Sequence, residues 1–418
     1  MSQELSLVRL SNGVRVALDP MPGLATAALG VWVRVGARWE PAAHNGVAHL
    51  FEHMAFKGAG PRDARQFAEA IENVGGLMNA ATGYERTAYY ARAVAGHAPF
   101  ALDLIADILF APHWDAAELE KEKGVVAQER GEAFDQPDDR VFELHQAALY
   151  PDQPLGRPIL GLDETLANVG VDTLTQFRDL HMTPDRVVIS AAGAFDRDGV
   201  LECAERRFGG LKPGAPQLAA PARAAPGRIC EVRKLEQAHL VFSWPAPAAG
   251  SDDIYAARLL SEIFGGGMAS RLFQEVRETR GLVYAIDSFL DVVEDDGRLM
   301  VYAGCAAANA RAVAEVVRAE LAALADHGPT DAELARAKAV AGAQLLMGLE
   351  TPSGRAEARA GQVFLRDCLM RAEELKARLD AATADEVRAQ AARALAGPAC
   401  AAVLGPKAGH GAADAFHA

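Results

Sequence analysis

The chain has 418 residues, of which half are apolar and 23% are charged. This composition is typical of a folded protein with more than one hydrophobic core, and it excludes an intrinsically disordered chain. Forty-two basic and 56 acidic side chains give a formal charge of −14. That charge argues against nucleic acid as a partner, because phosphate binding needs a basic surface.

No segment of the sequence predicts export or membrane insertion. Residues 1–20 have neither a basic region nor an apolar core of the kind found in signal peptides, and no run of about 20 apolar residues follows. We therefore expect a cytoplasmic location and no membrane partner. The five cysteines are scattered and form no Cys-x-x-Cys pair, so we expect them to be reduced.

Taken in chain order, the first half alternates strand and helix signals. A hairpin is expected over residues 5–18 and a strand over 26–35. A helix follows that holds paired histidines, and another is expected over 64–74. Two strands then run over 75–82 and 86–90, a helix covers 98–110, and a longer helix starts near Asp115. This order predicts an α+β fold with layered helices and sheets.

The segment His49-Leu50-Phe51-Glu52-His53 holds two histidines four residues apart. On a helix this spacing places both rings on one face, where they can reach a single metal ion. Asn45 is the expected N-cap of that helix and Gly58 its expected stop. His-x-x-Glu-His is the inverted form of a zinc-protease helix. The pattern still needs a third ligand, since paired histidines also occur without a metal.

The longer helix offers candidates for the third ligand. Glu122, Val125, Val126 and Glu129 are spaced so that they share one face. Carboxylates beside valines are costly to bury unless a positive charge lies opposite, and a metal ion would supply that charge. The alternative is that this face is only partly buried and the glutamates are solvated. Glu132, one turn further on, is the fallback ligand.

An internal repeat indicates two copies of one domain. Asp115–Lys121 resembles Thr330–Arg336, about 215 positions later (115 and 330). Residues 212–228 are rich in proline and alanine and suit a linker. The sequence thus predicts an N-terminal metal-binding domain over 1–211 and a homologous C-terminal domain over 229–418. Each is expected to be a mainly antiparallel sheet packed with helices.

The same offset indicates that only the first domain holds a metal. It pairs each candidate ligand with a residue that cannot replace it: His49 with Phe264, His53 with Met268, Glu122 with Ala337 and Glu129 with Gln344. The eight other histidines considered, among them His145 and His181, have no paired spacing and are expected at the surface. Residues 408–418 are mostly small and are expected to be loose.

Four stretches of the chain resemble the pitrilysin/insulinase family of zinc peptidases, and within it the short members akin to processing peptidases. They are His44–Gly58, Gly75–Ala80, Glu122–Glu129 and Ser270–Tyr284. The resemblance implies that one Zn²⁺ per chain is held by His49, His53 and Glu129. It implies that Glu52 is the general base and that Glu122 supports the ligands. It further implies that Arg277 and Tyr284 hold the substrate, and that Asn79 and Ala80 lie on the edge strand to which a peptide adds.

The function expected from this set is hydrolysis of peptides or unfolded polypeptide segments inside an enclosed chamber. Two imidazoles and one carboxylate leave zinc a position for water, whose proton Glu52 would take and pass to the leaving amine. Manganese or cobalt would accept the same ligands. In the family a chamber takes four such domains, which implies a homodimer of this chain; pairing with a different chain stays open. The alternative function is that of a non-catalytic scaffold or partner subunit.

Overall fold

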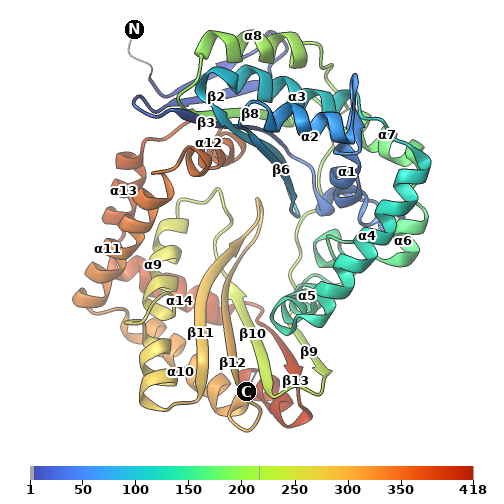
Figure 1. Ribbon diagram of the computed structural model, residues 1–418. Helices are drawn as coiled ribbons and strands as arrows, with labels where there is room; N and C mark the ends of the chain where they lie inside the picture. Colours follow the sequence, from blue (N-terminus) through green and yellow to red (C-terminus); the bar gives the residue numbers. More distant parts are fainter. Residues whose placement is uncertain (1–3, 216, 418) are drawn as a thin grey trace. The chain divides into compact units, whose positions relative to one another are not determined.

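The structure, a computed structural model, describes residues 4–215 and 217–417. These residues form two compact units, and most of their helices and strands are labelled in Figure 1. Unit 1 contains the residues up to 130 together with 157–220 and 347–370. Unit 2 contains 131–156, 221–346 and the residues from 371 onward.

Unit 1 is built on a six-stranded sheet of strand order β1-β2-β8-β3-β7-β6. Its strands are β1 (Ser6–Arg9), β2 (Arg15–Pro20), β3 (Thr26–Val33), β6 (Leu77–Thr82), β7 (Thr87–Val94) and β8 (Val187–Gly193). All neighbours are antiparallel except β2 and β8. The expected hairpin over 5–18 is the pair β1 and β2. Strand β6 forms one edge of the sheet, so one side of its backbone has no neighbouring strand among the described residues of this unit.

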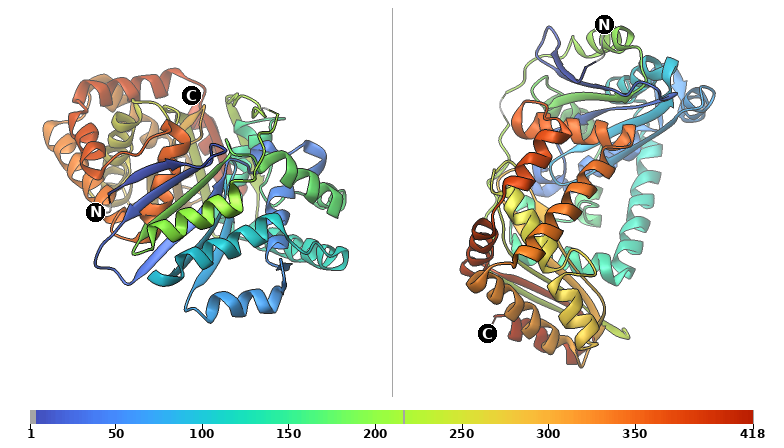
Figure 2. Two further views of the ribbon diagram at one scale, coloured as in Figure 1. Left: turned by 90° about the horizontal axis from the view of Figure 1, so that it is seen from above. Right: turned by 90° about the vertical axis from the view of Figure 1, so that its left-hand side faces the viewer.

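Helices cover both faces of this sheet. The helices of unit 1 are α1 (Val47–Ala55), α2 (Ala64–Glu72), α3 (Ala98–Phe110), α6 (Asp163–Ala167), α7 (Val171–His181), α8 (Arg197–Phe208), α12 (Pro352–Arg366) and most of α4 (Ala116–Asp135), whose last turn belongs to unit 2. Two short strands, β4 (Gly58–Ala59) and β5 (Arg62–Asp63), pair between α1 and α2. Seen from above in Figure 2, α3 and α8 lie side by side across the strands.

Helix α12 covers the opposite face of the sheet from α3 and α8. Ala356 and Val363 of this helix pack against Trp32 and Val188. A buried ion pair adds to the packing, since Arg359 Nε lies 2.7 Å from an oxygen of the Asp19 carboxylate. A helix from late in the chain thus completes the core of unit 1.

Unit 2 repeats this architecture. Its sheet has the order β11-β12-β10-β13-β9, and only β13 and β9 are parallel. The strands are β9 (Gly227–Val232), β10 (Gln237–Pro245), β11 (Val283–Val292), β12 (Gly297–Ala306) and β13 (Cys400–Gly405). Reading β9, β13, β10, β12 and β11 against β2, β8, β3, β7 and β6 reproduces both order and direction. The expectation of two similar α+β units is confirmed.

The helices of unit 2 include one in the stretch that was expected to be loose. They are α5 (Pro137–Leu149), α9 (Ile254–Phe264), α10 (Ala310–His327), α11 (Asp331–Gly348), α13 (Ala372–Ala381), α14 (Ala384–Ala396) and α15 (Gly411–His417). The expectation that residues 408–418 are loose is wrong for α15. Phe416 stacks on Phe242, with ring centroids 4.6 Å apart, and its burial holds the short helix in place.

Two histidines expected at the surface lie in the interior. His145 and His181 are each at most 3% exposed. His145 Nε2 lies 2.7 Å from Ser243 Oγ, and His181 Nδ1 lies 2.8 Å from a guanidinium nitrogen of Arg186. Ser243 lies 98 positions from His145 in the sequence, so no local pattern around His145 predicts this contact. Arg186 lies only five positions from His181.

Two segments lie on the other side of the division expected at residues 212–228. Residues 131–156, including α5, group with unit 2, and residues 347–370, including α12, group with unit 1. The described residues between Leu211 and Pro226 form no helix or strand, as a linker would. All five cysteines are free thiols. Among the helices of the described ranges, none has the length and apolar character needed to cross a membrane.

Candidate active site

Helix α1 begins on the side chain of a residue that precedes it by several positions. Oε1 of Glu40 accepts a hydrogen bond from the Ala48 amide, and Oε2 accepts one from the Gly46 amide, both at 2.8 Å. Asn45 Nδ2 donates to Oε2 as well, at 2.8 Å. The expectation that Asn45 caps the helix is wrong. Gly46, with φ +95°, is the N-cap residue, and the Glu40 carboxylate supplies the cap.

Helices α1 and α4 bring His49, His53 and Glu129 together. Nε2 of His49 lies 3.8 Å from Oε2 of Glu129, and Nε2 of His53 lies 3.5 Å from the same oxygen. One donor atom from each residue lies within 4.8 Å of the other two. Within the described ranges this is the group of three side chains suited to hold a metal ion.

The donor set fits zinc. Two imidazole nitrogens and one carboxylate oxygen are the protein ligands of a catalytic zinc site, which keeps its fourth position open. Burial, together with the nearby His53, lowers the pKa of His49 to about 4. The His49 ring is therefore neutral at pH 7 and keeps a lone pair for a metal. Its other nitrogen, Nδ1, is buried and has no hydrogen-bond partner in the structure.

Glu122 orients the second histidine. Its Oε2 lies 3.0 Å from Nδ1 of His53, so Nε2 of that ring is directed toward Glu129. Its Oε1 lies 2.5 Å from the Lys57 ammonium group. The sequence led us to expect a metal ion as the compensating charge for this buried carboxylate. The Lys57 ammonium group supplies that charge instead, and His53 Nδ1 lies within hydrogen-bond distance of the other oxygen. The only signal for Lys57 was its position four residues after His53.

Val125 does not share the buried face of α4. It is 41% exposed, whereas Val126 is fully buried and Glu122 is 6% exposed. The buried face of α4 consists of Leu119, Glu122 and Val126, and Val125 lies outside it. Glu132, the fallback ligand, is exposed and does not belong to the metal-binding group.

Glu52 lies next to the ligands but bonds to a strand. Its Oε2 accepts a hydrogen bond from Thr82 Oγ1 at 2.5 Å, at the end of β6. Burial raises the pKa of Glu52, against the effect of that hydrogen bond and of His53. A carboxylate with a raised pKa is a stronger base than an exposed one and suits proton transfer near neutral pH. Thr82 was within a predicted strand, but nothing in the sequence indicated this contact.

Two family models match the chain. The model of the insulinase family, peptidase family M16, covers residues 15–163, and the model of the peptidase M16 inactive domain covers 168–341. A protein of Bacillus subtilis named "Uncharacterized zinc protease YmxG" is 39% identical over 346 residues, which cover 82% of this chain and 84% of the relative. The chain belongs to peptidase family M16.

Further comparisons agree with membership of family M16. A protein of Mycobacterium bovis, also named as an uncharacterized zinc protease, is 38% identical over 407 residues, which cover 95% of this chain and 92% of the relative. The crystal structure of a peptidase M16 inactive domain from Pseudomonas fluorescens superposes with a TM-score of 0.87 over 97% of this chain and 98% of that one. At 21% identity that superposition shows the fold alone.

Unit 2 of this M16 chain contains a counterpart of α1, but not the one expected. All six buried positions of α1 fall on buried positions of α9 when shifted by 209 residues, Ala55 onto Phe264. The positions of His49, Glu52 and His53 are then taken by Arg258, Ser261 and Glu262. The expected counterparts Phe264 and Met268 are wrong, because the offset of the later helices does not hold for α9.

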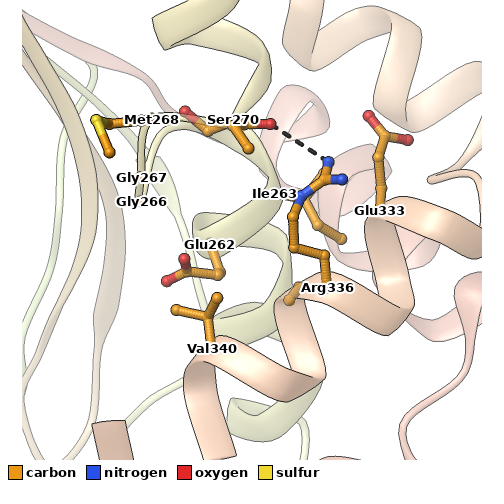
Figure 3. Close-up of a pocket in the computed structure, with 11 residues that line it drawn as sticks. Glu262, Ile263, Gly266, Gly267, Met268, Ser270, Glu333, Arg336 and Val340 are labelled. Carbon is orange, nitrogen blue, oxygen red and sulfur yellow. Dashed lines mark hydrogen bonds between the residues drawn. The ribbon is translucent and has the colours of Figure 1, made fainter. Parts of the chain in front are cut away.

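For α4 and α11 the expected offset does hold, and Gln344 takes the position of Glu129. Arg258, Glu262 and Gln344 line a cavity of about 470 Å³. Glu262 also lines a neighbouring cavity of about 270 Å³ beside Gly266 and Gly267, shown in Figure 3. The residues that line these two cavities include no imidazole, so they lack the donor set of unit 1.

Of the predicted substrate-binding residues, Asn79 and Tyr284 are exposed and Arg277 is partly exposed, whereas Ala80 is 7% exposed. Arg277, in a π-helical turn (Phe273–Thr279), places its guanidinium carbon 5.5 Å from the ring centre of Tyr284. Tyr284 is 78% exposed at the start of the edge strand β11. Asn79 and Ala80 lie on the edge strand β6, where Asn79 Oδ1 accepts a hydrogen bond from the Ala80 amide. The structure thus brings Arg277 and Tyr284 together and places Asn79 and Ala80 on an open strand.

Proposed function

We propose that this M16 chain is a zinc-dependent endopeptidase that hydrolyses peptides or unfolded polypeptide segments. The observation that carries the proposal is the convergence of His49 Nε2, His53 Nε2 and Glu129 Oε2 beside the carboxylate of Glu52. A non-catalytic scaffold subunit would not need three converging metal donors with the carboxylate of Glu52 next to them.

His49, His53 and Glu129 would hold the zinc ion, one per chain. When bound, zinc supplies Lewis acidity and lowers the pKa of water from 15.7 to about 7. Glu52 takes the proton from the attacking water and later delivers it to the leaving amine. Glu122 keeps the proton of His53 on Nδ1, so that Nε2 stays available.

Peptide substrate is proposed to bind by strand addition. The free edge of β6 offers backbone hydrogen bonds that depend little on the substrate's side chains, which suits unfolded segments. Asn79 and Ala80 would contact the added strand. Arg277 and Tyr284 would donate to substrate carbonyl oxygens, because both carry donors and their side chains are at least partly exposed. We further propose a homodimer whose units enclose the substrate in a chamber.

The decisive experiment is Glu52→Gln with two readouts, bound metal by elemental analysis and hydrolysis of an unstructured peptide. The variant should keep about one zinc per chain, because Glu52 is not a ligand. Its kcat should fall by about 10²- to 10⁴-fold, the usual contribution of a general base. Glu72→Gln, an exposed position on α2, is the control and should match wild type. Hydrolysis by wild type that survives removal of the metal by a chelator would reject the proposal.

A further inference from the structure

The two histidines of the metal site are held in different ways. His53 is oriented by a side chain, since Glu122 binds its Nδ1. His49 has no such support, because its Nδ1 is buried without a hydrogen-bond partner. The direction of the His49 ring therefore depends on packing and on where the first turn of α1 lies.

That first turn is fixed by Glu40. His49 follows directly after Ala48, whose amide donates to Oε1 of Glu40, and it stands three residues after Gly46, whose amide donates to Oε2. The carboxylate is 3% exposed, so no bulk water competes for these bonds. Burial raises the pKa of the Glu40 carboxyl to about 7, while the hydrogen bonds from Ala48, Gly46 and Asn45 favour its charged form, as does the helix dipole.

The cap is tied in turn to a second segment of unit 1. Asn45 bonds through Nδ2 to Oε2 of Glu40 and to the carbonyl oxygen of Pro158, and its own carbonyl accepts from Thr165 Oγ1 at 2.7 Å. Arg157 donates to the backbone oxygen of Glu40 at 2.5 Å. Helix α1 is only nine residues long, and a helix of that length is not stable by itself. Its position is thus set by its surroundings, of which Glu40 is the part that meets the helix end.

We propose that Glu40 is a positioning residue of the metal site, which fixes the first turn of α1 so that His49 faces the metal. This inference rests on the proposed function only in taking His49 as a zinc ligand. Both oxygens of Glu40 accept hydrogen bonds from N–H groups. Glutamine of the same size keeps one acceptor oxygen and turns an NH₂ group toward a donor, so the first turn must move.

The test compares Glu40→Gln with Asp19→Asn. Asp19 is also a buried carboxylate of unit 1, but it binds Arg355 and Arg359 of α12 and does not touch α1. Zinc affinity is measured by competition with a chromogenic chelator, and the site geometry by the visible spectrum of the cobalt-loaded protein. Stability is measured by thermal unfolding, and kcat and KM on a peptide substrate.

Glu40→Gln should weaken zinc binding about tenfold, the lower end of what loss of a supporting contact costs at metal sites. It should also alter the cobalt spectrum and lower kcat more than it changes KM. Asp19→Asn should lose stability and keep the zinc affinity and cobalt spectrum of wild type. The inference is overturned if Glu40→Gln is destabilised like Asp19→Asn but binds zinc and cobalt as wild type does.

If Glu40→Gln does not fold, Asn45→Ala replaces it. That variant removes one donor to Glu40 and leaves both amide contacts, so zinc affinity should fall by less than the tenfold expected for Glu40→Gln. An unchanged zinc affinity in Asn45→Ala overturns the inference. If wild type binds zinc but cleaves no peptide, the endopeptidase proposal fails while the affinity test of Glu40 still applies. If wild type binds no zinc, both fail.

Discussion

The buried carboxylate of Glu122 is held in place by two different partners. One of its oxygens faces His53 and the other faces Lys57. From the sequence, the spacing of Glu122 and Glu129 identified the face that meets the histidines. It could not identify Lys57, because a lysine just after a helix end is usually solvated. The capping role of Glu40 was not predictable for a similar reason, since a cap supplied by a residue outside the helix leaves no local sequence pattern.

Lys57→Met should weaken the metal site through Glu122. The carboxylate is 6% exposed and would lose the ammonium group that lies 2.5 Å from its Oε1. Leaving a buried acceptor unpaired costs about 1–3 kcal/mol of unfolding free energy. Zinc affinity should fall about tenfold as Glu122 loses its fixed position. Urea unfolding and chelator competition measure the two effects.

The control for Lys57→Met is Lys123→Met. Lys123 pairs with Glu120, whose side chain is largely exposed, and such a surface pair contributes at most about 1 kcal/mol. This variant should keep the zinc affinity of wild type. Equal zinc affinities for Lys57→Met and wild type would show that Glu122 orients His53 without help from Lys57.

At the scale of elements, the sequence predicted the helices and strands of the first half better than it predicted which helices of the two halves correspond. The glycine and β-branched signals placed β6 and β7, and the apolar run placed α3 over residues 98–110. The repeat at 115 and 330 correctly paired α4 with α11. It failed for α9 because the segments between the repeated helices differ in length, and a single offset cannot represent that. The burial pattern of α9, visible only in the folded chain, gives the right pairing.

The contact between α5 and β10 should make unit 2 sensitive to acid. His145 on α5 is buried against Ser243 on β10, and burial, with repulsion by Arg298, lowers the pKa of His145 to about 3 from 6.5. Below pH 6.5 the unfolded chain therefore binds a proton that the folded chain does not. The unfolding free energy should fall as the pH drops from 6.5 toward 3, by about 1.4 kcal/mol per pH unit from this group. Above pH 6.5 its contribution is constant.

His145→Gln keeps a polar atom near the position of Nε2 and removes the titration. Urea unfolding at pH 7.5, 6.5 and 5.5 should show a shallower loss of stability below pH 6.5 than in wild type. His327→Gln, at an exposed position, should keep the wild-type slope. Parallel slopes for His145→Gln and wild type would mean that the buried ring does not resist protonation.

For the whole molecule, the assignment of segments to units was the part least accessible from the sequence. Helix α12 has an apolar face in Ala356, Ala360 and Val363, but that face is equally compatible with either sheet. Its partner is selected by shape and by the ion pair of Asp19 with Arg359, which are 340 positions apart. Such pairing over long separations leaves no periodic signal. The fold class was predictable because it needs only the kinds of element and their order.

The proposed dimer makes a prediction about how two inactive variants combine. Glu52 lies in unit 1, whereas Arg277 and its neighbour Tyr284 lie in unit 2. If each site takes Glu52 from one subunit and Arg277 from the other, a dimer of Glu52→Gln with Arg277→Ala contains one complete site and one doubly altered site. Equal mixing of subunits should then restore about a quarter of wild-type activity, since half of the dimers are mixed and each has one of two sites intact.

If each site takes both residues from one chain, mixed dimers contain no complete site and activity stays at the level of the separate variants. Subunit exchange must be shown independently, by mass spectrometry of differently tagged chains, so that the absence of recovery counts against a shared site. Gel filtration adds a second criterion, because the purified chain alone should elute at the volume of a dimer if it forms a homodimer. A chain that elutes as an inactive monomer would instead require a different partner subunit. Arg277 and Tyr284 would then bind substrate at the active site of that partner, or equivalent residues of the partner would bind substrate at the site of this chain.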